Sequence, residues 1–161
     1  MLRHFLAALA YRTQKTLRGA PDSFATFQTA PKVRTPHELI HHMDSLLGYA
    51  RTFFIGGEYQ QEMLPDFTAE ILRFHATLAD VAHHLKIGTP FHRITPERML
   101  QGPFADAMTH VGQLAMLRRL ADSPVPPENF IYADMQPDNL GPNQPLPIRA
   151  GNRQGEWDEG Q

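Results

Sequence analysis

One stretch of the chain, between Leu64 and Lys86, carries apolar side chains at alternating intervals of four and three residues. These side chains are Phe67, Ile71, Phe74, Leu78, Val81 and Leu85. The spacing matches the turn of an α-helix, so it predicts a long amphipathic helix that opens at Leu64-Pro65-Asp66 and runs to about Lys86. Such a helix needs partners that cover its apolar face.

Three further segments have helical spacing and supply those partners. They cover residues 2–18, the stretch from Thr35 to about Phe54, and the stretch from Gly102-Pro103 to near Ala121. Residues 95–100 form a shorter helical turn, and no strand pattern or internal repeat is present. We therefore expect an all-α protein in which residues 1–144 form one four-helix bundle domain.

The start of the second helix is the clearest boundary signal. In Thr35-Pro36-His37-Glu38, Thr35 can cap the helix, Pro36 suits the first helical position, and Glu38 lies three residues after the cap. This combination predicts a capping box at Thr35.

The last part of the chain differs in composition. Residues 123–145 are rich in Pro, Asn and Asp and show no sustained period, which predicts an irregular C-terminal extension. Phe130 and Tyr132 are expected to hold this extension against the helices. Residues 145–161 are expected to form a flexible C-terminal tail.

Composition argues against several classes of function. The 161 residues have a formal net charge of −2, whereas a nucleic-acid partner would require a basic surface. Arg118 and Arg119 are expected to be solvated at the C-terminal end of a helix, where the helix dipole favours positive charge. The absence of cysteine excludes disulfides, thiolate zinc sites and a cysteine nucleophile. No apolar run is long enough for a membrane span and no clear signal peptide is present, so we expect a cytoplasmic protein without a membrane partner.

Nine histidines are many for this length, and they are clustered. On a helical wheel, His41 falls in the polar sector of the second helix, and His42 falls at the edge of the apolar arc beside Tyr49. Only His42 is therefore expected to face the bundle seam, either as a hydrogen-bonded boundary residue or as a ligand. His75, at the margin of the apolar stripe between Leu64 and Lys86, is expected to line the same cavity of the bundle as His42.

Asp106 and His110 raise a similar question in the last helix. They are four residues apart, so they project from the same side of the helix, next to its apolar face. This is the spacing with which one helix offers two ligands to one metal ion. The alternative is an intrahelical ion pair, which is worth only a few tenths of a kcal/mol when exposed.

Two segments resemble the DinB-like (DNA-damage-inducible) superfamily. TPHELIHHMDSLL is similar to the family's first histidine segment, and THVGQLAMLRRL, residues 109–120, is similar to its last-helix segment. The resemblance covers residues 1 to about 144 and places family ligands on His42 and His110. The family pattern has a histidine four residues before the last one, where this chain has Asp106.

The resemblance implies a four-helix bundle, often a homodimer, with a divalent metal held by three side chains at one end. His42, Asp106 and His110 would be those side chains, and two His with one carboxylate suit Zn, Ni or Fe. Characterised members include thiol-dependent transferases and a mycothiol-dependent isomerase. A low-molecular-weight thiol is therefore a possible second cofactor.

The expected function is that of a metal-dependent enzyme, of the hydrolase or thiol-dependent transferase type, acting on a small molecule. Gln113, His75, Tyr49 and Tyr132 are expected to support the metal ligands or face the substrate, and residues 128–144 are expected to cover the metal end. Two alternatives remain open. One is a metal- or ligand-binding bundle without catalysis, and the other is a structural dimerisation module with no metal.

Overall fold

The computed structural model describes residues 1–148, and within them every regular element is a helix. The long helices are α1 (Leu2–Leu17), α2 (Pro36–Ile55), α3 (Phe67–Ile87) and α5 (Ala105–Leu120). The shorter elements are η1 (Asp22–Thr26), α4 (Pro96–Met99), η2 (Leu100–Phe104) and η3 (Phe130–Tyr132). The all-α prediction is confirmed for this part of the chain. None of these helices has both the length and the apolar character of a membrane span.

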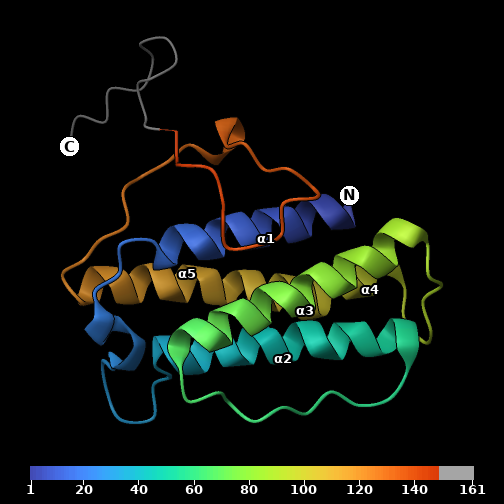
Figure 1. The fold of residues 1–161 in the computed structure, drawn as a ribbon, viewed down its shortest axis with the longest axis horizontal. Helices are drawn as coiled ribbons and strands as arrows, with labels where there is room; N and C mark the ends of the chain where they lie inside the picture. Colours follow the sequence, from blue (N-terminus) through green and yellow to red (C-terminus); the bar gives the residue numbers. More distant parts are fainter. Residues whose placement is uncertain (149–161) are drawn as a thin grey trace.

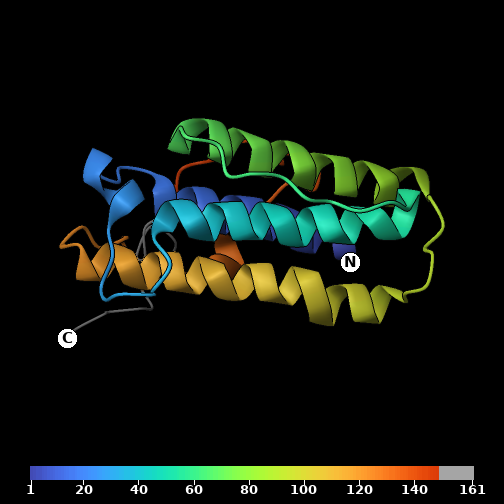
Figure 2. The same ribbon diagram turned by 90° about the horizontal axis from the view of Figure 1, so that it is seen from below.

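The four long helices run side by side along the longest axis of the molecule (Figure 1). α2 packs against α3 and α5, and α1 packs against the same two helices from the other side. Seen from below, α2 lies between α3 and α5 (Figure 2). The apolar side chains that these helices share form one core, which includes Leu6, Met43, Phe74 and Leu114.

The start of α2 follows the prediction. The hydroxyl of Thr35 accepts a hydrogen bond from the Glu38 N–H, and the Glu38 carboxylate accepts one from the Thr35 N–H. This reciprocal pair satisfies backbone donors that the first helical turn leaves free. Asp66 caps α3 in a similar way, through a bond from the Ala69 N–H.

The last helix opens at Gly102-Pro103, as predicted. The short helix α4 runs into η2, where Gly102 has non-helical angles (φ −90°, ψ −107°) and makes a kink between two helices. Pro103 has no N–H to donate, which suits the first turn of a helix, and α5 continues from there.

Arg118 was expected in solvent, and it is buried instead, with 4 % exposure. Its guanidinium donates to the backbone oxygens of Thr16, Arg18 and Gly19, at and just after the end of α1. It also donates to the backbone oxygen and the hydroxyl of Ser123. Arg118 thus supplies donors to carbonyls that α1 leaves without helical partners. Arg119 is exposed, as expected.

A charged cluster joins α2 to α3. Glu70 is fully buried and receives hydrogen bonds from the Leu64 N–H at 2.8 Å and from Arg73 at 2.5 Å. Arg73 also lies 3.2 Å from Asp44, and Nδ1 of His41 lies 3.1 Å from Glu70. His41, predicted in the polar sector of α2, is partly exposed, and its ring also contacts a buried carboxylate of the neighbouring helix.

Residues 122–148 run back over α1, on the far side of the molecule from α2 (Figures 1 and 2). Phe130 packs edge-on against Tyr11, and the Glu128 carboxylate, fully buried, accepts a bond from the Tyr11 hydroxyl and lies 3.1 Å from the Lys15 ammonium. The predicted irregular extension that packs through Phe130 is confirmed.

The first residues of the predicted tail make contacts with the rest of the chain. Arg18, at the end of α1, donates to the Pro145 carbonyl, and the Ile148 N–H donates to the Glu128 carboxylate of the extension. Residues 149–161 of that predicted tail lie outside the described part of the chain.

Candidate metal centre

Two neighbouring helices, α2 and α5, bring three potential metal ligands together. His42 comes from α2, and Asp106 and His110 lie one turn apart on α5. One potential ligand atom from each residue lies within 4.8 Å of those of the other two. His110 is buried, His42 is partly buried, and the Asp106 side chain is 50 % exposed. The cluster therefore lies at the edge of the α2–α5 seam, with its carboxylate accessible to water.

Gln113 fixes the orientation of the His110 ring. Its Oε1 accepts a hydrogen bond from Nδ1 of His110 at 2.9 Å, so the proton of the neutral imidazole is on Nδ1. The other ring nitrogen, Nε2, is buried without a hydrogen-bond partner and lies 3.3 Å from Oδ1 of Asp106. In the neutral ring these two atoms would present lone pairs to each other. A second proton or a cation between them removes this conflict.

His42 is suited to bind a cation because it is held in the neutral form. Burial lowers its pKa, and the neighbouring Arg34 and His110 lower it further, against an opposing effect of Asp106. The rings of His42 and His110 meet edge to face, with centroids 4.8 Å apart. A neutral imidazole is the form that coordinates a metal, so this environment favours ligation near neutral pH.

The donor set fits a divalent transition metal. Two imidazole nitrogens and one carboxylate oxygen are a familiar set for Zn, Ni or Fe. Three protein ligands leave at least one coordination position for water or a substrate, as in catalytic rather than structural zinc sites. Among these observations, the buried Nε2 of His110 without a hydrogen-bond partner best suits a metal ligand.

The four residues expected around the ligands have different outcomes. Gln113 is in place, bonded to His110. His75 is not, because its Nδ1 donates to the Leu140 carbonyl at 2.7 Å, which holds the ring beneath the C-terminal segment. Tyr49 lies on α2 about two turns after His42, where it is 54 % exposed and packs against Phe53.

Tyr132 and the segment around it do not cover the metal ligands, as they were expected to do. Tyr132 belongs to η3, and the neighbouring Phe130 packs on Tyr11 and Arg12 of α1. The buried Glu128 holds the same segment to α1. The α2–α5 side of the molecule is thus left open in residues 1–148 (Figure 2).

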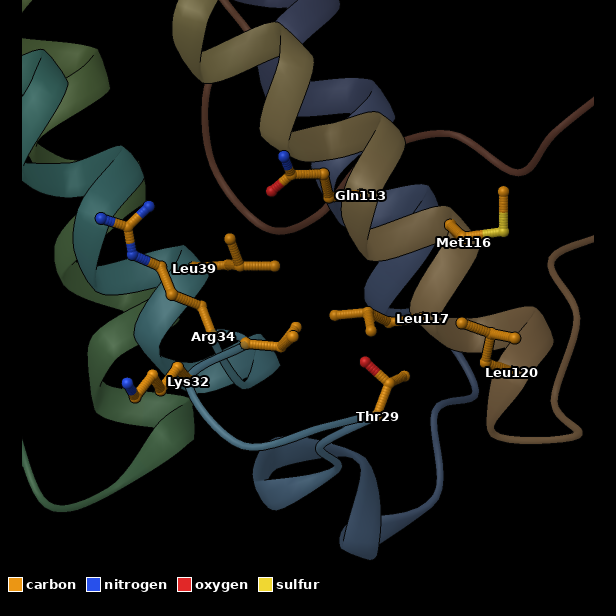
Figure 3. Close-up of a pocket in the computed structure, with 9 residues that line it drawn as sticks. Thr29, Lys32, Arg34, Leu39, Gln113, Met116, Leu117 and Leu120 are labelled. Carbon is orange, nitrogen blue, oxygen red and sulfur yellow. The ribbon is translucent and has the colours of Figure 1, made fainter.

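A pocket beside the metal ligands was not predicted from the sequence. It has a volume of about 530 Å³ and lies between the start of α2, the loop before it and the second half of α5 (Figure 3). Gln113 lines it from α5, and Lys32 and Arg34 line it from the loop. The charged ends of Lys32 and Arg34 lie on the α2 side of the pocket (Figure 3). Helical periodicity could not reveal the loop residues, because residues 20–34 have no sustained period.

No family model matches the chain, and neither a curated protein nor a solved structure matches it. The functional conclusion therefore rests on the chemistry of the side chains in the α2–α5 seam.

Proposed function

We propose that this chain is a DinB-like four-helix bundle and a metal-dependent enzyme, with a divalent cation held by His42, Asp106 and His110. The observation that carries the proposal is the buried Nε2 of His110, which faces Asp106 without a hydrogen-bond partner among the described residues. The resemblance of TPHELIHHMDSLL and THVGQLAMLRRL to family segments supports the same three residues. The four long helices and their packing are consistent with it.

The residues of this chain would divide the work as follows. His42 and His110 provide neutral nitrogen ligands, and Asp106 adds a negative charge that favours a divalent cation. Gln113 keeps Nε2 of His110 turned toward the site, in the way that outer partners of metal-binding histidines usually do. A bound divalent metal would lower the pKa of a water or thiol ligand and so supply a nucleophile at neutral pH.

The open side of the cluster supports a reaction on a small molecule from solvent. Because Asp106 is half exposed, a small molecule can approach the ligands from solvent. Either a hydrolase, in which water is the nucleophile, or a transferase, in which a low-molecular-weight thiol is the nucleophile, fits this arrangement. Zn, Ni and Fe are the metals that the donor set favours.

The test of the metal site is elemental analysis of purified protein after dialysis against Zn²⁺. Wild-type protein is expected to retain one equivalent, and His110→Ala and Asp106→Asn are expected to lose it. His83→Ala is the matched control, because His83 is an exposed histidine on α3, outside the cluster. Equal stoichiometry in His110→Ala and wild type would reject the site.

Cobalt substitution separates the two reaction types. A thiol that binds Co²⁺ directly gives an intense sulfur-to-metal charge-transfer band, and its appearance on adding dithiothreitol would support the transferase. Exchange of a bound water without that band would support the hydrolase. A spectrum that responds to neither would indicate a closed, non-catalytic metal site and contradict the proposed enzyme.

A further inference from the structure

The pocket next to the metal ligands combines apolar walls with positive charge. Leu39 of α2 and Leu117 of α5 form its buried floor, and their side chains point toward each other across it (Figure 3). Met116 and Leu120 continue the apolar surface along α5. These two side chains are 53 % and 55 % exposed, so their apolar surface is accessible to a ligand.

The charge in this pocket is all of one sign. Lys32 and Arg34 are exposed, and neither side chain forms an ion pair or a hydrogen bond within residues 1–148. The pocket is lined by no Asp or Glu. Two cations without counter-charges at the edge of an apolar cavity favour an anionic ligand.

Position links this pocket to the metal centre. Gln113 lines the pocket and also accepts the hydrogen bond from His110. The Arg34 guanidinium lies on the α2 side of the pocket, across from Gln113 (Figure 3). A molecule bound here would therefore have one end next to the three metal ligands.

We propose that this pocket binds the substrate and that the substrate is an organic anion with an apolar body. Arg34 and Lys32 hold its carboxylate or phosphate group, and Leu39, Leu117 and Leu120 contact the apolar body. A guanidinium suits both groups, because its planar donors match two anionic oxygens. Only the assignment of this ligand as the substrate rests on the proposed function, and the binding itself does not.

The test is calorimetric titration of metal-free protein with three probes of equal chain length: octanoate, octyl phosphate and 1-octanol. Saturable binding of at least one anion, at least about tenfold tighter than that of the alcohol, is the expected result. The stronger of the two anions identifies the group that the cations prefer. Equal binding of all three probes, or no binding of any, would overturn the proposal.

Matched variants locate the binding. Arg34→Gln and Lys32→Gln should each weaken the binding of the anion by about tenfold, because each removes one hydrogen bond to a charged group. Met116→Asn/Leu120→Asn should weaken it as well. Arg119→Gln removes an exposed charge of α5 that does not line this pocket, and it should leave binding unchanged. Equal effects of Arg34→Gln and Arg119→Gln would contradict the assignment.

Two further measurements keep this proposal separate from the metal site and from self-association. His110→Ala should lose the metal and keep octanoate binding, so a protein that binds octanoate but no metal contradicts only the proposed metal centre. Sedimentation equilibrium tests whether a second copy of the chain occupies the pocket. A dimer that dissociates in Arg34→Gln and does not bind the anions would overturn the small-molecule proposal.

Discussion

Gly48 lies in the interior of α2, where alanine would ordinarily favour the helix. In this protein the ring of Tyr59 packs directly on the Gly48 backbone, and a Cβ at this position would overlap the ring. The Tyr59 hydroxyl donates to Asp44 at 2.9 Å, so moving the ring also breaks a bond to a buried carboxylate. Gly48→Ala is therefore expected to destabilise the fold by about 1–3 kcal/mol, measured by urea denaturation.

The matched control is Gly112→Ala in α5. A Cβ at Gly112 would contact nothing within 4 Å, so alanine should stabilise this helix by up to about 1 kcal/mol. Stabilisation by alanine at both glycines would show that helix propensity, not the Tyr59 contact, decides both.

Some site residues could be predicted singly from the sequence. His42 and the pair Asp106–His110 follow from the helical period, because that period fixes which side chains share a face. The role of His75 could not be predicted, since its partner is the Leu140 carbonyl in a segment with no period. The prediction that Arg118 is solvated was wrong for the same reason. Whether a residue at the end of one helix is buried depends on which other segment of the chain lies against it.

At the scale of elements, Arg118 joins α5 to the end of α1. Lysine in its place would keep the charge but has a single nitrogen with three donors, so several buried carbonyls would lose their partners. Arg118→Lys is expected to lower the free energy of unfolding by about 2–4 kcal/mol in urea titrations. Arg119→Lys, at the exposed neighbour, should stay within about 0.5 kcal/mol of wild type, and a similar loss in both variants would contradict this role of Arg118.

The cluster between α2 and α3 makes stability depend on pH. Burial alone would raise the pKa of Glu70, but hydrogen bonds from the Leu64 N–H, Arg73 and His41 together lower it below its ordinary value. The stabilisation by ionised Glu70 is therefore fully present above its unfolded-state pKa of about 4.3, and it is lost as the pH falls through the lower folded-state pKa.

This predicts that Glu70→Gln is less stable than wild type at pH 7, by about 1–3 kcal/mol. The difference should shrink as the pH falls below about 4, because wild type then loses the charge that the variant lacks. Urea denaturation midpoints of wild type and variant, taken over this pH range, measure the stability difference. Glu62→Gln, at an exposed glutamate, is the control. A difference that stays constant over this range would contradict the role of the charged carboxylate.

Some boundaries of elements could be predicted from local patterns. The capping box at Thr35 is such a pattern, and the structure confirms it. Gly102 and Pro103 also mark a helix start, because the glycine has non-helical angles and the proline has no N–H to donate. The burial of Met99 in the turn before them gives no comparable local signal.

For the molecule as a whole, the proposed metal site predicts a stability that depends on metal concentration. A cation that binds only the folded chain at about one hundred times its dissociation constant contributes about 2.7 kcal/mol. For a chain of this size, the melting temperature should then rise by about 5–10 °C on adding Zn²⁺ and fall again with a chelator. Scanning calorimetry measures the shift.

The same scan on His42→Ala should show no metal-dependent shift, whereas His83→Ala should keep it. A comparable rise of the melting temperature with Zn²⁺ in both variants would mean that Zn²⁺ binds elsewhere on the chain. This whole-molecule measurement is independent of stoichiometry and therefore complements elemental analysis.

The arrangement of the chain in space could be predicted only in part. The periods of four segments gave the number of long helices, but not which of them are neighbours. The path of residues 122–148 over α1 depends on Glu128, which lies in a polar, proline-rich stretch and gives no sequence signal of burial. For this reason the side of the molecule that stays open could not be predicted.

The contacts of Arg118 also have a consequence for the kinetics of folding. They join residues about a hundred positions apart, such as Arg118 and Thr16, which are separated by 102 residues along the chain. Closing so long a loop costs chain entropy, so we expect these bonds to form after the helices have largely packed. Their loss should then speed unfolding while leaving the refolding rate almost unchanged. Arg118 would thus determine how long the native state persists more than how quickly it is reached.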